Sequence, residues 1–370
     1  MRIGVPTEVK VDEHRVAATP HAVHDLVADG HTVVIQAGAG IGSSLFDEDY
    51  VDAGATILDT AEEVWGESDL VLKVKEPLAS EYGHLRDDLT LFTYLHLAAD
   101  EALTRALLDA GTTAIAYETV TDNSGGLPLL APMSEVAGRM APQVGAATLQ
   151  AEHGGRGVLL GGVSGVQPEH VVVIGAGTAG GNAAWLAAGM EARVTVLDIN
   201  IDRLRWIDAI HQGRITTLMS DSLTLSQQIA DADLVIGAVL VPGARAPKLI
   251  SREHLQTMRP GAVFVDIAID QGGCAETSTV TTHSDPTYIV DDVVHYCVGN
   301  MPGAVPHTST YALTNVTTPF SRQLAAGVGA ALDADAHLRN GLNTHDGVLT
   351  NVPVGRAHDI PAVDPGDVSV

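Results

Sequence analysis

The feature that most constrains the fold is an apolar run that leads into three closely spaced glycines. Residues 171–174 are Val-Val-Val-Ile, which is typical of a buried strand. Gly175, Gly177 and Gly180 then form the pattern G-x-G-x-x-G ahead of a helix-forming run. In a βα turn of this kind the first glycine permits a tight bend, the second lets a pyrophosphate approach the backbone, and the third lets helix pack on strand. The free N–H groups of the helix amino terminus attract the phosphates. The pattern predicts dinucleotide binding.

An acid at the end of the next strand indicates which dinucleotide. The strand 194–197 ends on Asp198, eighteen residues after the last glycine. A carboxylate there accepts hydrogen bonds from the ribose hydroxyls and repels a 2′-phosphate, so the sequence predicts NAD rather than NADP. Arg193, Arg203 and Arg205 lie near enough in sequence to meet a 2′-phosphate, but the acid decides the prediction.

Bulk properties set the class of protein. A chain of 370 residues is too long for one ordinary core and suits two α/β domains. The formal net charge of −26 argues against nucleic acid or an anionic membrane as partner. No apolar run approaches the roughly 18 residues that a membrane helix needs. Cys274 and Cys297 have no metal-binding spacing and are interpreted as reduced thiols. The chain is predicted to be soluble and cytoplasmic, with no metal site.

Strand and helix patterns alternate along the chain, which predicts an α/β fold of two Rossmann-like, doubly wound parallel sheets with an active-site cleft between them. The predicted strands of the first half are 2–5, 31–35, 56–58, 70–74, 89–94 and 114–117, and the predicted helices are 21–29, 47–53, 61–65 and 100–110. Residues 1–128 with 307–370 are predicted to form a discontinuous substrate domain. Residues 129–306 are predicted to form the NAD-binding domain.

The second half is predicted in less detail. Ser134 is expected to cap a helix that runs to Gln150. Further strands are expected at 233–238, 262–267 and 288–290, then a loop over 295–307 and a helix over 309–327. The tail beyond Val352 is rich in Pro, Gly and Asp, so it is expected to be loose.

The carboxyl ends of parallel strands are where open α/β sheets bind ligands. Lys75 and His96 each follow a predicted strand of the first domain, and Arg15 lies in a loop able to reach the same edge. In the second domain Leu240 and Asp270 follow predicted strands in the same way. Two such edges can hold a nicotinamide on one side and a substrate on the other.

These residue types suit the chemistry of a small oxo or amino acid. Arg15 can clamp a carboxylate with two hydrogen bonds, and Lys75 can bond the oxygen on C2. Histidine titrates near neutral pH, so His96 can pass protons to or from that oxygen or an attacking water. Asp270 can hold water or ammonia and balance a developing iminium charge. Each also has an ordinary interpretation: Arg15 as a surface charge, Lys75 or its neighbour Lys73 as a solvated strand end, His96 as a surface histidine, and Asp270 as a turn residue.

Several motifs taken together resemble one enzyme family. They are the segments 1–8, 13–16, 72–77, 94–98, 131–139, 266–273 and 298–306. The segments closely resemble alanine dehydrogenases, over residues 1 to about 350. The resemblance implies substrate contacts from Arg15 and Lys75, catalytic roles for His96 and Asp270, and a cytosolic hexamer. Besides the three glycines, the predicted NAD contacts are Ser134, Thr178, Ala179, Asp198, Arg203, Ser220, Val239, Leu240, Ile267, Asp270, Val298, Asn300 and Met301. The helix after Ser309 departs from family members expected to bind a metal there, so no metal is predicted.

The implied reaction is the reversible oxidation of L-alanine by NAD and water to pyruvate and ammonia. Three alternatives remain at this point: the hydride-transfer subunit of a transhydrogenase, a lysine-type dehydrogenase, and a non-catalytic NAD sensor. A transhydrogenase would not need Arg15, Lys75 and His96 together, and a lysine-type enzyme would need an acidic pocket for the distal amine. The sequence leaves open the preference among alanine, glycine or glyoxylate, serine and 2-aminobutyrate. It also leaves open the direction in the cell, the number of subunits and the salt dependence.

Overall fold

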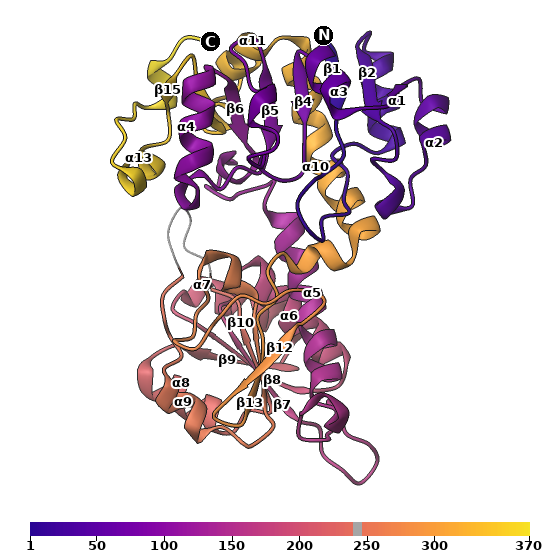
Figure 1. Cartoon of the computed structure of the whole chain (residues 1–370). Helices are drawn as coiled ribbons and strands as arrows, with labels where there is room; N and C mark the ends of the chain where they lie inside the picture. Colours follow the sequence, from indigo (N-terminus) through magenta and orange to yellow (C-terminus); the bar gives the residue numbers. More distant parts are fainter. Residues whose placement is uncertain (240–245) are drawn as a thin grey trace. The chain divides into compact units, whose positions relative to one another are not determined.

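The computed structural model describes residues 1–239 and 246–370, and it divides into two compact units. Unit 1 comprises Met1–Met133 with Val305–Val370, and unit 2 comprises Ser134–Ala304. Each unit is built around one sheet (Figure 1). The α/β class with two mainly parallel sheets is therefore confirmed.

The sheet of unit 1 is parallel over its first six strands in chain order. Across the sheet the order is β15 (Val348–Leu349), β14 (Leu342–His345), β6 (Thr113–Ala116), β5 (Thr90–Thr93), β4 (Leu70–Leu72), β1 (Arg2–Val5), β2 (Thr32–Gln36) and β3 (Thr56–Leu58). β14 pairs antiparallel with β6 and with β15. The parallel strands follow the order 3-2-1-4-5-6 of a dinucleotide-binding fold.

The helices of unit 1 connect these strands and continue into the C-terminal segment. They are α1 (Pro20–Ala28), α2 (Asp47–Asp52), α3 (Ala61–Glu67), α4 (Glu101–Ala110), α10 (Pro306–Ala326), α11 (Val328–Ala334), α12 (Ala336–Arg339) and α13 (Val352–His358). α1 has a capped start: the Thr19 hydroxyl accepts a hydrogen bond from the N–H of Ala22 at 3.3 Å, and Pro20 is the first helical residue.

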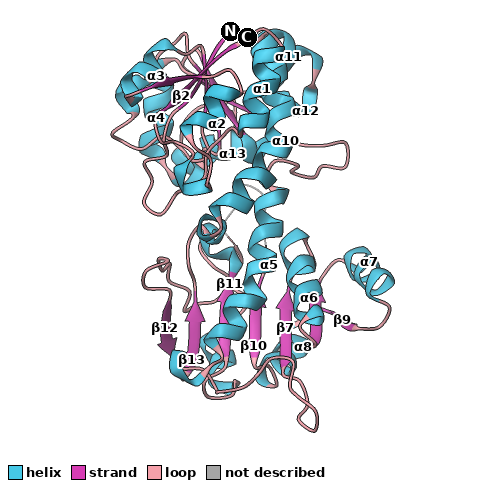
Figure 2. Cartoon of the chain, turned by 90° about the vertical axis from the view of Figure 1, so that its right-hand side faces the viewer, coloured by secondary structure: helices cyan, strands magenta, loops and turns pink. Residues whose placement is uncertain are grey.

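The sheet of unit 2 repeats the same order. Across it lie β12 (Thr287–Val290), β13 (Val293–Tyr296), β11 (Val263–Asp266), β10 (Leu234–Gly237), β7 (His170–Ile174), β8 (Arg193–Asp198) and β9 (Ile215–Met219), with β12 antiparallel. The helices are α5 (Ala131–Thr148), which starts at the end of unit 1, α6 (Thr178–Gly189), α7 (Ile201–His211), α8 (Ser222–Ala230) and α9 (Arg252–Thr257). Figures 1 and 2 show α5 and α6 on one side of the sheet and α8 on the other.

The apolar run 171–174 forms most of β7, the central strand of unit 2. All five residues of β7 are buried between the parallel neighbours β8 and β10. On one face Val172 and Ile174 pack in a cluster with Ile229 of α8, Leu255 of α9 and Phe264 of β11. Burying a side chain of this size contributes roughly 1.5–3 kcal/mol, which explains why a strand covered on both faces is apolar throughout.

Two predictions about where elements begin and end are wrong. Ser134 does not cap α5, because the helix begins at Ala131 and Ser134 lies in its first turn. Pro132 fits that first turn, where an N–H has no helical partner, so the helix can begin before it. The loop expected over 295–307 is shorter, since β13 extends to Tyr296 and α10 begins at Pro306.

The C-terminal tail is packed against unit 1 rather than loose. Residues beyond Val352 form α13, and Ala362 makes a β-bridge with Leu349. Nη1 of Arg339 donates to the carbonyls of Pro365 at 2.9 Å and Val368 at 2.8 Å. Composition alone missed this because a single arginine can satisfy the carbonyls of a segment with few apolar side chains.

Candidate active site

Three loops of unit 1 leave the carboxyl ends of neighbouring strands where the strand order reverses. β1 lies between β2 and β4, so the chain winds outward in opposite directions from this point. Ligands of open α/β sheets bind in the crevice that such a reversal leaves. The loop after β1 carries Arg15, the loop after β4 carries Lys75, and the loop after β5 carries His96.

Arg15 is buried, and its guanidinium pairs with Glu13. Arg15 is 2% exposed, its Nε donates to Oε1 of Glu13 at 2.6 Å, and its Nη2 contacts the other oxygen of the same carboxylate. Nη1 donates to Sδ of Met133 at 2.9 Å. Burial opposes ionisation of Glu13, but the hydrogen bonds and charge of Arg15 lower the pKa of Glu13 to about 2. The interpretation of Arg15 as a surface charge is therefore wrong.

Lys75 is also buried, and a carboxylate fixes the main chain that carries it. Oε1 of Glu8 accepts a hydrogen bond from the N–H of Val74 at 2.6 Å, and Oε2 accepts one from the N–H of Lys75 at 3.3 Å. Lys73 is fully buried, with its Nζ 3.1 Å from Glu8 and 3.0 Å from Glu81. A buried ammonium is stable only when it is paired, so Lys73 is a structural residue of the strand end and not a solvated one.

His96 projects from a backbone that few side chains adopt. Its φ is 51° and its ψ is 35°, in the left-handed region, which costs a residue other than glycine about 1–3 kcal/mol. Oε1 of Glu118 accepts hydrogen bonds from the N–H of His96 at 2.6 Å and of Leu95 at 3.2 Å. The ring stacks on Tyr94, with centroids 5.8 Å apart and an interplanar angle of 4°. The imidazole is exposed yet held in one direction.

The charges of these side chains act on the same carboxylates. Burial raises the pKa of Glu76, but the charges of Lys75, Lys10 and His96 together bring it below its usual value. The charge of Lys75 also helps to lower the pKa of Glu13, the partner of Arg15. The structure therefore brings Arg15, Lys75 and His96 together at one edge of unit 1, as the strand-end rule predicts.

In unit 2 the three glycines of the turn differ in the space around them. Gly175 has a φ of +106°, and a Cβ there would lie 2.5 Å from the carbonyl oxygen of Ala238. A Cβ on Gly180 would lie 1.8 Å from the carbonyl oxygen of Gly175. At Gly177, by contrast, a Cβ would meet no described atom within 4 Å. Two glycines are thus required by packing, and the third leaves open space before the amino terminus of α6.

Asp198 lies at the end of β8 beside this turn. Its Oδ2 accepts a hydrogen bond from the N–H of Ala176 at 2.5 Å, and its Oδ1 accepts one from the N–H of Asn200 at 2.7 Å. Its carbonyl accepts from the N–H of Ser220 at 2.9 Å, which places two predicted cofactor residues side by side. Arg203 is exposed in the first turn of α7.

Asp270 and the loop around Asn300 are also brought together. Asp270 is exposed in the 3₁₀ turn η6 (Ile267–Gln271), and its Oδ1 accepts a hydrogen bond from the N–H of Asn300 at 3.0 Å. The preceding Asp266 is fully buried and accepts bonds from the N–H of Ala268 at 3.0 Å and of Cys274 at 2.9 Å. Asp266 therefore anchors the turn that carries Asp270.

The remaining predicted cofactor residues lie at helix starts or just beyond strands. Ser134 lies in the first turn of α5, Thr178 and Ala179 open α6, Val239 follows β10, Ile267 opens η6, Val298 follows β13, and Met301 opens η7 (Met301–Ala304). Leu240 lies outside the described residues.

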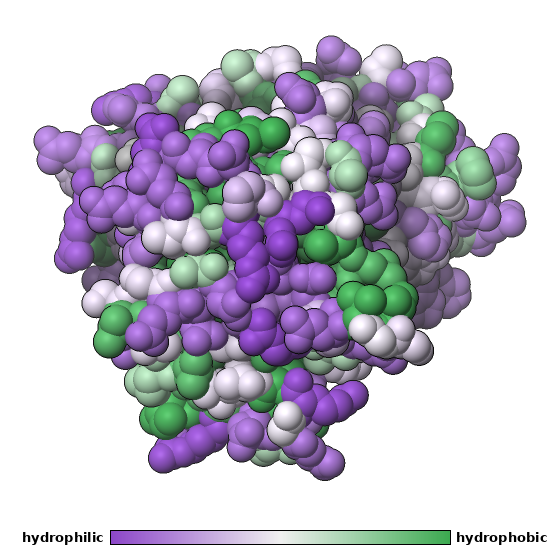
Figure 3. Space-filling model, turned by 90° about the horizontal axis from the view of Figure 1, so that it is seen from below, coloured by the Kyte–Doolittle hydropathy of each residue, from purple (hydrophilic) through white to green (hydrophobic). Residues whose placement is uncertain are grey.

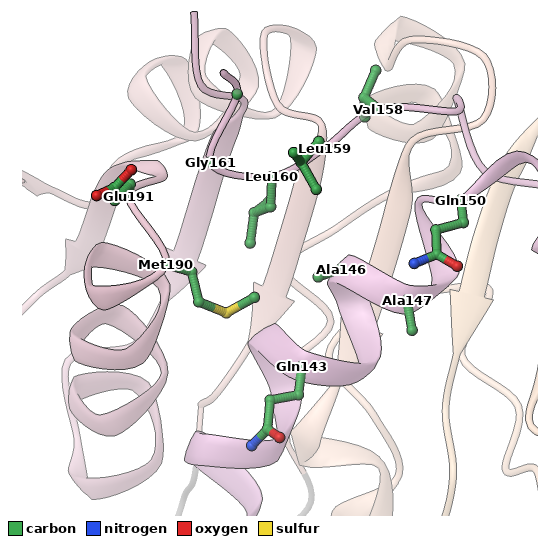
Figure 4. Close-up of a pocket in the computed structure, with 11 residues that line it drawn as sticks. Gln143, Ala146, Ala147, Gln150, Val158, Leu159, Leu160, Gly161, Met190 and Glu191 are labelled. Atoms are coloured by element: carbon green, nitrogen blue, oxygen red, sulfur yellow. The ribbon is translucent and has the colours of Figure 1, made fainter. Parts of the chain in front are cut away.

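One pocket of unit 2 lies away from this edge. It has a volume of about 510 Å³ and lies between the end of α5, the segment before β7 and the end of α6 (Figure 4). Its lining includes Gln143, Gln150, Leu160, Met190 and Glu191, which precede the strands rather than follow them. The pocket contains none of the predicted site residues.

Within 1–239 and 246–370, no three or more His, Cys, Asp or Glu side chains are grouped so that they could hold a metal ion. In the same residues no helix is both long and apolar enough to cross a membrane.

Comparison with known proteins gives consistent matches over both halves of the chain. Residues 4–137 match the family model described as "Alanine dehydrogenase/PNT, N-terminal domain", and residues 141–352 match "Alanine dehydrogenase/PNT, C-terminal domain". The alanine dehydrogenase of Mycolicibacterium smegmatis is 58% identical over 365 residues, which cover 98% of each chain. That of Methanococcus maripaludis is 53% identical over 363 residues, covering 98% of this chain and 97% of that protein.

Solved structures agree with the sequence matches. A structure of L-alanine dehydrogenase superposes with a TM-score of 0.94 at 49% identity and covers 97% of this chain and 99% of its own. A transhydrogenase from Sinorhizobium meliloti gives a TM-score of 0.81 at 24% identity, covering 95% of this chain and 99% of its own, which shows a likeness of fold alone. The strand order, the glycine turn and these matches together establish that the chain belongs to the alanine dehydrogenase/PNT family.

Proposed function

We propose that this chain is an enzyme that catalyses the reversible, NAD-dependent oxidative deamination of L-alanine. In this reaction L-alanine, NAD⁺ and water give pyruvate, ammonium, NADH and a proton. The main support is the gathering of Arg15, Lys75 and His96 at the switch point of unit 1, in a chain that is 52–58% identical to alanine dehydrogenases. A nucleotide-binding sensor has no need of these three side chains, and a transhydrogenase has no need of a carboxylate clamp.

Unit 1 is proposed as the substrate domain, with Arg15 and Lys75 holding the substrate. Glu13 occupies one side of the Arg15 guanidinium and keeps it aligned. The positive charge of Arg15 is therefore held in one buried position. An ionised carboxylate brought to that site gains charge-assisted hydrogen bonds, which are stronger than neutral ones. Lys75 supplies a second positive charge, which can also donate to the oxygen on C2 of pyruvate.

Unit 2 is proposed as the NAD-binding domain. The turn Gly175 to Gly180 would hold the pyrophosphate and Asp198 the ribose, while Asp270 and Asn300 would border the nicotinamide end. NAD bound there supplies an acceptor for the hydride that leaves C2 of alanine. The chemistry requires that the substrate held by unit 1 reach the nicotinamide held by unit 2.

His96 is proposed as the residue that moves protons. After loss of hydride the substrate is an iminium, and His96 takes a proton from the water that adds to C2. It gives that proton to the nitrogen as ammonia leaves, and the hydroxyl proton is released as the carbonyl of pyruvate forms. Asp270 balances the positive charge of the iminium. The exposed and fixed ring of His96 suits this role, since a general base must reach the water directly.

The direct test is NADH formation from a panel of amino acids. We expect L-alanine to give the highest kcat/KM, with glycine, serine and 2-aminobutyrate lower and lysine inactive. With NADP as the oxidant, the rate should fall by at least about tenfold, because Asp198 repels a 2′-phosphate. A chain that prefers lysine, or that oxidises none of these amino acids, would contradict the proposed function.

We further propose that the chain forms a homo-oligomer, as a hexamer, in the cytoplasm. Large apolar side chains are exposed on unit 2, with Trp185 47%, Trp206 54% and Leu159 65% exposed. Figure 3 shows one face of the molecule, on which hydrophobic residues gather in patches among hydrophilic ones. Such patches favour association between copies. Light scattering of the purified protein should give about six times the mass of the chain, and the mass of a monomer would contradict this proposal.

Cys274 and Cys297 are both buried free thiols, which suits a reducing compartment.

A further inference from the structure

The main chain at both reactive strand ends of unit 1 is held by a carboxylate from a distant part of the sequence. Glu8 accepts the N–H groups of Val74 and Lys75, and Glu118 accepts those of Leu95 and His96. In each case two successive N–H groups point at one carboxylate, immediately beside a side chain proposed to act on the substrate. Hydrogen bonds to a charged acceptor are stronger than neutral ones, so this arrangement resists rotation of the segment.

The backbone at His96 depends more on its carboxylate than the backbone at Lys75 does. A residue in the left-handed region returns to an extended conformation unless its surroundings hold it, and that change would turn the imidazole away. β5 ends at Thr93, and beyond it the N–H of Tyr94 still donates to the carbonyl of Val74 at 3.3 Å. The next two N–H groups, of Leu95 and His96, are the ones that Glu118 holds before the 3₁₀ turn η3 (Leu97–Ala99) begins.

Glu118 contacts the side chain of His96 as well as its backbone. Its Oε1 lies 3.9 Å from Nδ1 of the ring, beyond a hydrogen bond but close enough for attraction to a charged imidazole. Tyr94 covers one ring face, and its hydroxyl donates to the carbonyl of Leu129 at 2.6 Å. The carboxylate of Glu76 also acts on the ring through its charge. Nδ1 therefore faces Glu118, and Nε2 lies on the opposite side of the ring.

We propose that Glu118 is the positioning residue for His96: it holds the strained backbone by two N–H groups and orients the ring without touching the substrate. Glu118 can be replaced with less damage to the fold than Glu8 can. Glu8 shares a fully buried ion-pair network with Lys73, so its loss leaves an uncompensated charge in the core. The side chain of Glu118 is 16% exposed, so water can reach the groups that its removal leaves.

The proposal rests on the catalytic role proposed for His96, and its test separates the two. We would measure kcat, the KM for alanine, the Kd for NADH and thermal unfolding for Glu118→Ala and Glu118→Gln. Glu118→Ala should lower kcat at least about tenfold, because a small misplacement of a catalytic group has this effect. KM and Kd should stay within about threefold of the wild-type values, since Arg15, Lys75 and the NAD residues keep their contacts. A residue with a merely structural role would change all of these quantities together.

Glu118→Gln provides the rescue by a conservative change. The amide oxygen can replace Oε1 and accept the short bond from the N–H of His96, so kcat should recover to within about tenfold of wild type and exceed that of Glu118→Ala. If Glu118→Ala does not fold, Glu118→Gln carries the test, with kcat lowered about threefold or more at an unchanged KM. Glu101→Gln is the matched control, because Glu101 is an exposed carboxylate of unit 1 that pairs only with Arg105 among the described residues, at 2.7 Å.

Two results would overturn the proposal. One is a kcat for Glu118→Ala, or for Glu118→Gln where only that variant folds, that equals the wild-type value. The other is a loss of kcat matched by equal losses in KM and in NADH binding. A fully active His96→Ala variant would instead remove the proposed mechanism itself, so the two failures are distinguishable.

Discussion

Replacing His96 with alanine should lower turnover of L-alanine by at least about a hundredfold, the usual contribution of a general acid–base group. The ring lies at the carboxyl edge of unit 1, held by Glu118 and stacked on Tyr94, next to the charges of Lys75 and Glu76. Among its neighbours, the buried Tyr94 has a raised pKa, the pKa of Glu76 is lowered, and Lys75 is needed as a cation. His96 is therefore the group best placed to take a proton from water. Binding of NADH should be unchanged, since the predicted cofactor residues belong to unit 2.

A matched histidine on the same unit controls for general damage. His24 lies on α1 with 68% of its side chain exposed. Its Nδ1 is 3.6 Å from Oδ1 of Asp25. His24→Ala should retain full turnover and the same thermal unfolding temperature. Turnover and NADH binding would be measured for both variants by absorbance and fluorescence. An active His96→Ala variant would exclude this histidine from the mechanism while leaving the fold and the cofactor intact.

Much of the fold follows from local patterns that the sequence displays. The buried run 171–174 and the glycines after it specify a strand, a turn and a helix within a single stretch. The alternation of strands and helices in residues 1–117 predicts a parallel sheet, and the structure gives it the same order as the sheet of unit 2. The carboxyl ends of parallel strands share one edge of the sheet. Because Lys75 and His96 each follow a strand, the sequence is enough to predict that they lie at the same edge.

The supporting carboxylates could not be found in this way. Glu8 is 66 residues from Val74, and Glu118 is 22 residues from His96, so their pairing depends on strand order rather than on local spacing. Glu13 is different, because it lies two residues before Arg15 and a buried arginine needs an acid. The sequence offered that signal, but Arg15 had to be recognised as buried before it could be used.

Replacing Gly180 with alanine should unfold or loosen the turn proposed to bind NAD. Its loss of stability should exceed that of an alanine at Gly177 or Gly181. The new Cβ would lie 1.8 Å from the carbonyl oxygen of Gly175 and 3.3 Å from the Cβ of Ala238. The contact is with backbone, so α6 must move away from β7. Overpacking of this kind costs about 1–3 kcal/mol or more, and NADH binding should be lost with the displaced turn. Thermal unfolding and NADH fluorescence would measure the two effects.

Two neighbouring glycines separate the contribution of packing from that of binding. A Cβ on Gly181 would meet only the ring of Trp206, at 3.7 Å, among the described atoms, so Gly181→Ala should leave NADH binding unchanged and stabilise α6 by up to about 1 kcal/mol. Gly177→Ala should also fold normally, because no described atom lies within 4 Å of its Cβ. That Cβ would nevertheless fill the space before the helix amino terminus, so NADH affinity should fall about ten- to a hundredfold, as expected when hydrogen bonds to a charged phosphate are lost. Wild-type affinity in Gly177→Ala would mean that the pyrophosphate binds elsewhere, whatever the outcome for Gly180→Ala.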